Sequence, residues 1–176
     1  AETFFDNAID AYSEVRVALQ SDGKILAAGS FCPAGCQEEA DGVSSSRVYV
    51  ARYSPNGQLD STFGSGGYVK MDVNSSTSCV RGIAVQSDGR IVLVGAAKLI
   101  ALPRHIGYVA RFNQDGSLDA EFGGTGIVKK NIVAGADDVF TALTMQNDGK
   151  IVFAGTSLYS TYKHFVVGRM WQGAPH

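Results

Sequence analysis

The sequence predicts an all-β fold, a β-propeller built of four-stranded antiparallel blades with three blades per chain. Two motifs recur in a fixed order about every 60 residues, which is typical of repeat architectures. Gly accounts for 21 of the 176 residues, well above the average share of about 7%, and it recurs at matched positions. No segment with the period and length of a helix competes with the short β-prone runs.

The first motif places a turn between two strands of each repeat. A first apolar run leads into Gln-Ser-Asp-Gly or Gln-Asn-Asp-Gly, and a second apolar run ends in Gly. Asp-Gly between β-prone runs favours a hairpin, because the turn needs a positive φ. We therefore expect each copy to form two paired strands, with the last Gly closing the second. The copies are Val17–Gly29, Ile83–Gly95 and Leu143–Gly155.

The second motif supplies the third and fourth strands. It carries Val-Ala-Arg or Val-Gly-Arg and, in two copies, continues through Leu-Asp to Phe-Gly and a glycine-rich turn. The fourth strands are expected at Tyr68–Met71 and Ile127–Lys130, and the third copy is truncated. A solenoid of stacked hairpins is the alternative architecture. The copies of this motif are Tyr49–Gly64, Tyr108–Gly123 and Val166–Met170.

These motifs resemble the delta-60 repeat family of bacterial proteins, many of which are secreted or held at the cell surface. The resemblance rests on the Gln-Ser-Asp-Gly-Lys-Ile-Leu-Ala-Ala-Gly segment and on Ala-Arg-Tyr-Ser-Pro-Asn-Gly-Gln-Leu-Asp-Ser-Thr-Phe-Gly. It implies a β-propeller-like fold and an exported protein. It implies no activity, because the family has no common catalytic motif to carry over. The long insertion at Ser30–Ser46 departs from the repeat.

The repeat boundaries predict an incomplete ring. We expect blades at about 14–73, 80–133 and 139–172, the last without its fourth strand, whereas residues 3–8 precede the first blade where a fourth strand would lie. Propellers have four to eight blades, so two chains would give six. The sequence therefore predicts a homodimer in which the N-terminal strand completes the last blade of the partner. A fragment of a longer propeller, or a partial barrel with an open edge, is the alternative.

Three cysteines bear on the compartment. Cys32 and Cys36 lie in the insertion, where a disulfide within the loop would suit an oxidising compartment, and reduced thiols or a metal pair are the alternatives. Cys79 could be buried and inert, pair with either of them, or bridge two chains. The Ala1-Glu2 start suits cleavage of a signal peptide, although a shortened chain would begin in the same way. We expect a secreted, cell-surface or periplasmic protein.

The connections between second and third strands, and between successive blades, differ from repeat to repeat. Because divergent loops on a repeated scaffold commonly carry binding residues, they form the predicted ligand-binding face. Exposed tyrosines beside polar groups suit stacking on a sugar or contact with a protein. Ordinary solvated loops are the alternative. The candidate residues are Phe31, Arg104, His105, Tyr159, Tyr162 and His164.

One set of repeated polar residues has a structural interpretation. Arg52 and Arg111 are each followed eight residues later by an aspartate, Asp60 or Asp119, which favours an Arg–Asp pair within each blade. A ring of arginines that attracts anions into a central channel is the alternative, with Arg169 at the third position. The glutamines Gln20, Gln86 and Gln146 are expected to satisfy backbone groups at the turns.

Composition excludes several function classes. A net charge of −2 argues against a nucleic-acid partner, and no apolar run is long enough to span a membrane. No catalytic motif and no second cysteine pair with zinc spacing occurs, so the sequence predicts no catalytic residues, no metal and no cofactor. The predicted function is a module that binds or adheres to a glycan or a cell-surface protein. A hydrolase or lyase site assembled in the dimer from His105, His164 and acidic loop residues is one alternative, and a structural unit of a cell-surface assembly is the other.

Overall fold

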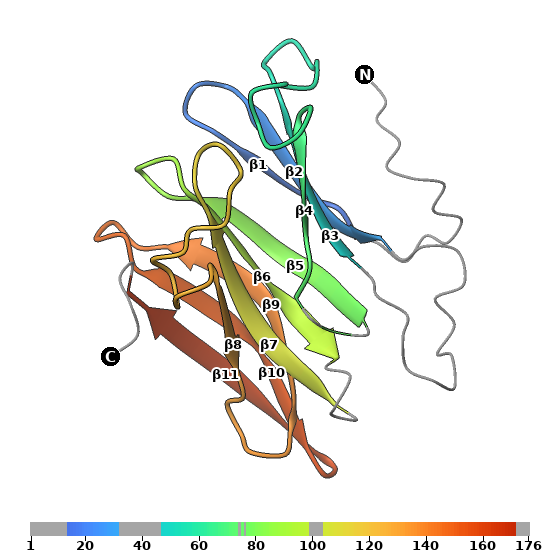
Figure 1. The fold of residues 1–176 in the computed structure, drawn as a ribbon. Coiled ribbons are helices and arrows are strands. Elements are labelled where there is room, and N and C mark those ends of the chain that lie inside the picture. The colour runs from blue at the N-terminus through green and yellow to red at the C-terminus, as the bar shows by residue number, and fades with distance from the viewer. Residues whose placement is uncertain (1–13, 32–46, 74, 76, 99–103, 172–176) are drawn as a thin grey trace.

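The structure is a computed structural model, and it describes residues 14–31, 47–73, 75, 77–98 and 104–171. Within these residues all the regular structure is β, and it forms three antiparallel sheets that follow one another in space (Figure 1). This confirms the all-β class expected from the repeats. The described residues contain no helix long and apolar enough to cross a membrane.

Each sheet follows the chain in simple order, so neighbouring strands in the sequence are neighbours in the sheet. Sheet I contains β1 (Arg16–Leu19), β2 (Ile25–Phe31), β3 (Arg47–Tyr53) and β4 (Tyr68–Met71). Sheet II contains β5 (Thr77–Val85), β6 (Ile91–Lys98), β7 (His105–Phe112) and β8 (Ile127–Lys130). Sheet III has three described strands, β9 (Asp137–Met145), β10 (Ile151–Tyr159) and β11 (Tyr162–Met170).

The two expected fourth strands are confirmed as β4 and β8, each paired with the third strand of its sheet. The proposed exchange strand at residues 3–8 lies outside the described residues, as do Cys32, Cys36 and most of the insertion.

The Asp-Gly turns join the first strand of each sheet to the second, as the first motif predicts. In sheet I the Gly23 amide donates to the Gln20 carbonyl, and the Gln20 amide donates to the Lys24 carbonyl. Only the glycine of each turn has a positive φ, for example 82° at Gly23. The aspartate stays in the ordinary region, and its side chain accepts a hydrogen bond from the amide two residues later, as Asp22 does from Lys24.

The expectation that the last Gly of the first motif ends the second strand is wrong. Gly95 lies inside β6, opposite a bulge in β5 where the register shifts between Val80 and Gly82. A Cβ on Gly95 would lie only 1.9 Å from the carbonyl oxygen of Cys79. The glycine is therefore required because the bulge brings a neighbouring backbone too close for any side chain.

The sheets pack face to face, and β6 is buried on both sides. Its side chains alternate, so that Ile91 and Leu93 join the core between sheets I and II, whereas Val92 and Val94 join the core between sheets II and III. All four are fully buried, as the continuous apolar run predicts. The first strand of each following sheet makes much of this contact, with β5 against sheet I and β9 against sheet II.

The predicted Arg–Asp pairs are confirmed. Arg52 Nε donates to Asp60 Oδ2 at 2.9 Å, and Arg111 Nε donates to Asp119 Oδ2 at 2.8 Å. Each guanidinium also stacks on a buried ring: Arg52 lies 4.6 Å from the centroid of Phe63, and Arg111 has the equivalent contact. Both arginines are buried, which is incompatible with an anion-attracting ring at these two positions.

Candidate functional site

Four residues from three strand ends of sheets II and III meet on the side of the divergent loops. Arg104 immediately precedes β7, His105 begins it, Asp137 begins β9, and Tyr159 ends β10. The His105 backbone amide donates to Asp137 Oδ1 at 2.6 Å, and His105 Nδ1 lies 3.2 Å from the same oxygen. The carboxylate of Asp137 thus joins the two sheets at this edge. We call Arg104, His105, Asp137 and Tyr159 the loop cluster.

Gly135 is at the centre of the loop cluster. Its φ is 88°, a conformation that favours glycine, and a Cβ at this position would lie against two side chains. Tyr159 Cε2 lies 3.3 Å from that position, and Arg104 Nη1 lies 3.7 Å from it. The ring of Tyr159 and the guanidinium of Arg104 therefore flank one small patch of backbone. Tyr159 remains 51% exposed, so its ring is available to a ligand.

Of the other predicted ligand-binding residues, Tyr162 and His164 lie on the β10–β11 hairpin, whereas Phe31 lies in sheet I. Tyr162 is the cross-strand partner of Tyr159 at the end of the β10–β11 hairpin, and it is exposed. His164 lies opposite Ser157 on the same hairpin. Phe31 ends β2 of sheet I, and its side chain lies outside the described atoms. The structure therefore brings Arg104, His105 and Tyr159 together and leaves Phe31 in a different sheet.

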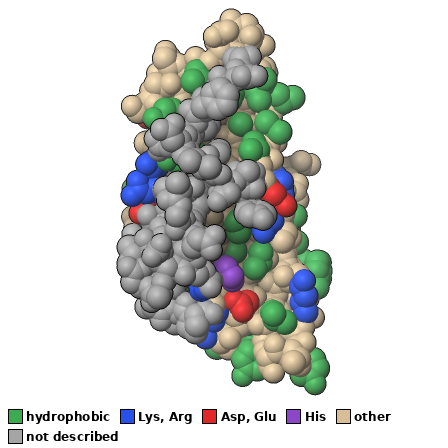
Figure 2. All heavy atoms as spheres, turned by 90° about the vertical axis from the view of Figure 1, so that its right-hand side faces the viewer, with side chains coloured by type: hydrophobic (Ala, Val, Ile, Leu, Met, Phe, Trp, Pro, Cys, Tyr) green, Lys and Arg blue, Asp and Glu red, His purple; other side chains and the backbone are tan. Residues whose placement is uncertain are grey.

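Charged and histidine side chains gather on one face of the molecule. In Figure 2, which views the molecule from the right of Figure 1, histidine, acidic and basic side chains lie close together in the middle and lower part of the view. Hydrophobic side chains lie between and below them. Such a mixture of charged and apolar groups is the composition that a polar ligand with an apolar face would need.

Asp138, a buried aspartate that was not among the predicted site residues, directly follows Asp137 of the loop cluster. Asp138 is fully buried, and its Oδ2 accepts a hydrogen bond from the Ile132 amide at 2.7 Å. With its amide turned, the Asn131 side chain donates to the same oxygen at 3.0 Å. Asp138 Oδ1 and the hydroxyl of its cross-strand partner Ser157 are buried without a partner. Asp138 therefore holds Asn131 and Ile132 at the start of the connection that carries Gly135.

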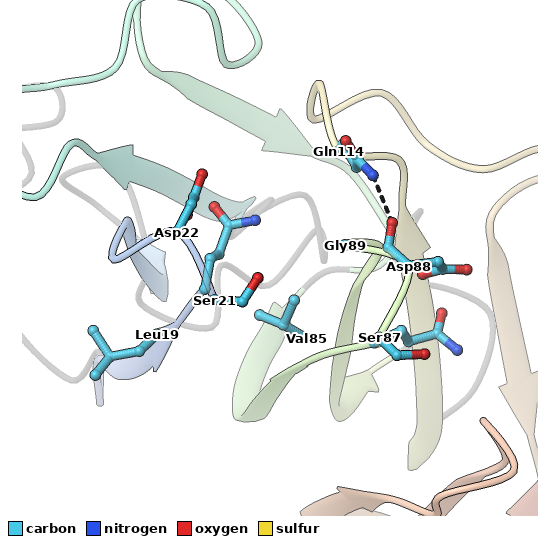
Figure 3. Close-up of a pocket in the computed structure, with 10 residues that line it drawn as sticks. Leu19, Ser21, Asp22, Val85, Ser87, Asp88, Gly89 and Gln114 are labelled. Atoms are coloured by element: carbon cyan, nitrogen blue, oxygen red, sulfur yellow. Dashed lines mark hydrogen bonds between the residues drawn. The ribbon is translucent and has the colours of Figure 1, made fainter.

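A pocket of about 580 Å³ lies at the opposite ends of the strands, between the β1–β2 and β5–β6 turns. Figure 3 shows Asp22 and Ser21 on one side of it and Asp88 on the other, from two copies of the same motif. A hydrogen bond from the Lys24 backbone amide lowers the pKa of Asp22. The pocket lining is Leu19, Gln20, Ser21, Asp22, Val85, Gln86, Ser87, Asp88, Gly89 and Gln114.

The sequence did not indicate this pocket, because most of its lining comes from the repeated turns rather than from the divergent loops. The scaffold role is also real: Gln86 Nε2 donates to the Gly149 carbonyl at 3.3 Å, so it satisfies the turn of the following sheet rather than its own. Gln114 Nε2 donates to the Asp88 carbonyl at 2.5 Å. Neither His105 nor His164 lines the pocket, so it offers no support for a site built from those histidines.

Of the three cysteines, Cys79 lies within the described residues. Cys79 lies in β5 as a free, half-buried thiol, and its Sγ lies 3.5 Å from the Ala96 carbonyl oxygen as a weak donor. Among the described residues, no group of three or more His, Cys, Asp or Glu side chains could hold a metal ion.

Comparison with protein families bears on the fold. Residues 20–32, 40–63 and 86–122 match a family model. That family is described as a domain of unknown function (DUF5122) with a β-propeller fold. The matched residues include both turn motifs and both Arg–Asp pairs of sheets I and II, and together they make up less than half of the chain. The stacked antiparallel sheets agree with this similarity to a β-propeller. Comparison with curated proteins found no match.

Proposed function

We propose that this protein is a secreted, cell-surface or periplasmic binding module that recognises a glycan through the loop cluster. The observation that carries the proposal is the meeting of Arg104, His105 and Tyr159 around Gly135 and Asp137. These residues come from two sheets and from loops that differ between repeats. A repeated scaffold has no need for such residues at its divergent end, and binding residues are commonly found there.

The chemistry of the cluster favours a sugar. The exposed ring of Tyr159 offers a flat apolar face, on which the C–H face of a pyranose can stack while its hydroxyl groups remain free to form hydrogen bonds. Arg104 supplies several N–H donors in a planar arrangement, and the Asp137 carboxylate and His105 ring supply an acceptor and a titratable group. Tyr162 extends the aromatic surface along the hairpin.

The same proposal includes the finer architecture. We infer that the repeats are of the delta-60 type and that three four-stranded blades per chain combine, in a homodimer, into one six-bladed ring. Support comes from the two motifs at a common period, from the packing of each sheet on the next and from the propeller family match. In such a ring the loop clusters of both chains would lie on one face, so a branched or repetitive glycan could bind two clusters at once.

Glycan binding is testable on a glycan array, followed by titration calorimetry with the best ligand. We expect Tyr159→Ala and Arg104→Ala each to weaken binding about tenfold or more, because each removes a direct contact. Trp171→Ala is the matched control, since it removes an exposed aromatic from beyond the other end of β11. Equal affinity for the control and the two loop variants would rule out the cluster as the site. Binding to a protein extract with no glycan binding would indicate a protein ligand instead.

A further inference from the structure

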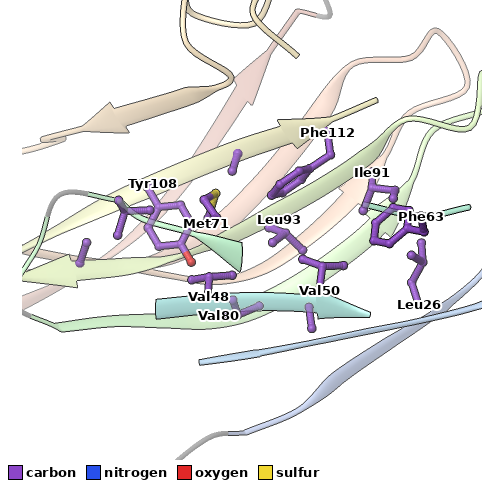
Figure 4. Packing of buried hydrophobic residues seen from close by; sticks show 14 residues of the cluster. Leu26, Val48, Val50, Phe63, Met71, Val80, Ile91, Leu93, Tyr108 and Phe112 are labelled. Carbon is purple, nitrogen blue, oxygen red and sulfur yellow. The ribbon is translucent and has the colours of Figure 1, made fainter. Parts of the chain in front are cut away.

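The interface between sheets I and II defines how a first strand packs on the preceding sheet. Ile83 and Val85 of β5 pack against the core between sheets I and II. Figure 4 shows that core, to which β2 and β3 of sheet I contribute apolar side chains. The contributing side chains of β2 and β3 are fully buried. They are Leu26, Ala28, Val48 and Val50.

The interface between sheets II and III repeats this arrangement one unit further along. Leu143 and Met145 of β9 occupy the motif positions of Ile83 and Val85, and they pack against the second core. The receiving side chains, Val92, Val94 and Val109, occupy the positions of Leu26, Ala28 and Val50 and are likewise fully buried. Two independent interfaces therefore use the same positions of the repeat.

At the two ends of the stack the same positions are exposed or, for Val152 and Ala154, half-buried. On sheet III the receiving positions are Val152, Ala154, Phe165 and Val167, which we call the outer face of sheet III. Phe165 is 78% exposed and Val167 is 60% exposed. On β1 the docking positions are Val17 and Leu19, which are 66% and 73% exposed.

We propose that the outer face of sheet III binds β1 of a second copy of this chain, and that the reverse contact forms at the other end. The inference rests on the dimeric ring of the proposed function and deepens it by naming the two surfaces. The second copy is the occupant because this chain itself carries both halves of the interface that it uses twice internally. Two identical contacts between unlike surfaces close a ring of two chains.

The sizes of the facing residues agree with this pairing. At the second interface, a Cβ on Gly82 would lie 2.7 Å from Leu143 Cδ2, so the missing side chain makes room for the leucine. On sheet III the position of Gly82 is taken by Ala142, and on β1 the position of Leu143 is taken by Val17. Compared with the second interface, the receiving sheet gains one carbon (Gly to Ala) and the docking strand loses one (Leu to Val). The combined side-chain volume is therefore conserved.

A polar contact should accompany the apolar one. In sheet I, Arg52 Nη1 donates across the interface to the Gln114 carbonyl of sheet II at 2.5 Å. Arg169 holds the position of Arg52 on sheet III, where it is exposed, and Pro55 holds the position of Gln114 in the repeat. We therefore expect Arg169 to donate to the carbonyl of Pro55 of the partner subunit.

Light scattering coupled to size exclusion tests the two surfaces. We expect the wild-type chain to have twice the 18.6 kDa mass of one chain. Phe165→Asp and Val17→Asp should each weaken the dimer about 30-fold or more, because a carboxylate would be buried without a partner. Ile132→Asp is the matched control: it places the same charge at an exposed aliphatic position away from both surfaces and should leave the dimer intact. Circular dichroism should show the same fold in all three variants.

Mixing the two disrupted variants gives a stricter test. Phe165→Asp retains β1, and Val17→Asp retains the outer face of sheet III, so only the mixture contains one undamaged contact. We expect a complex of two chains in the mixture and monomers of each variant alone. A monomeric wild type, or dimers in both variants, would overturn the proposal. A larger closed ring would overturn the copy number. Glycan binding by the wild-type dimer separates this result from failure of the loop cluster.

Discussion

Val109 and Val167 hold the same position of the repeat, yet Val109 is fully buried and Val167 is largely exposed. Both lie two residues before the Arg of an apolar third strand, so the residue type and its place in the motif do not explain the difference. What differs is the presence of a following sheet: β9 covers sheet II, and nothing in the described chain covers sheet III in the same way. A repeat therefore specifies an apolar face, and the neighbouring unit decides whether that face becomes core.

The largest effect should come from emptying a buried interface. Leu93→Ala removes a side chain that packs between sheets I and II, and such cavities cost about 2–5 kcal/mol of unfolding free energy. Leu158→Ala makes the same change at an exposed position of sheet III and should cost less than about 0.5 kcal/mol. Urea denaturation of both variants measures the difference. Equal losses would mean that burial between the sheets does not control stability.

The Val109 and Val167 pair sharpens the comparison at one repeat position. Val109→Ala should cost about 2 kcal/mol, since two methyl groups leave a closed core. Val167→Ala should cost under about 0.5 kcal/mol in dilute monomer. At concentrations where the dimer forms, the Val167→Ala cost should approach that of Val109→Ala. A cost for Val167→Ala that is independent of protein concentration would contradict coverage by a second copy.

The next largest effect is expected at the Arg–Asp ion pairs of sheets I and II. The Thr62 hydroxyl and amide, together with the Arg52 guanidinium, hold the pKa of Asp60 well below its usual range. A carboxyl with a lowered folded-state pKa stabilises the fold above its unfolded pKa near 4 and loses that contribution as the pH falls. Stability should therefore decline from pH 5 towards pH 2.

Asp60→Asn tests this contribution directly. We expect it to cost about 1–3 kcal/mol at pH 7, because Arg52 is left buried with a weaker acceptor. It should also flatten the decline of stability below pH 5 in thermal melts. An unchanged acid profile in Asp60→Asn would assign the decline to other carboxyl groups.

The smallest effect is expected at the exposed turns. Half-buried Lys24 and exposed Asp22 form an ion pair at 3.2 Å, and solvent screens such pairs so that they contribute little to stability. Asp22→Asn should therefore change the melting temperature little, and 0.5 M salt should remove what difference there is. A large effect would indicate that the pocket between the turns has a structural role.

Most of the fold could be predicted from the two repeated motifs. The strand order, the turns at Gly23, Gly89 and Gly149, and both Arg–Asp pairs follow from residues that are close in the sequence or fixed by the period. The interior position of Gly95 did not follow, because the bulge opposite it lies in another strand. Sequence alone gives no sign of which backbone atoms approach a glycine.

The candidate site was less predictable than the fold. Arg104, His105 and Tyr159 were predicted as binding residues because of the divergent loops, and the structure places them close together. Asp137 was not among the predicted site residues, although it is the residue that joins His105 across the sheets. Contacts between different repeats depend on how the sheets stack, and that angle is not encoded in any one motif.

The repeated packing of first strands on preceding sheets has a consequence for assembly beyond this chain. Because each unit offers one docking strand and one receiving face, contacts of this kind are self-propagating, and only the rotation between successive sheets limits them. If the rotation returns the last sheet to the first, the assembly is finite and has no free edge. If the rotation falls short, the same surfaces build an endless helical filament. The twist from one sheet to the next therefore determines whether the assembly is a closed particle or a fibre.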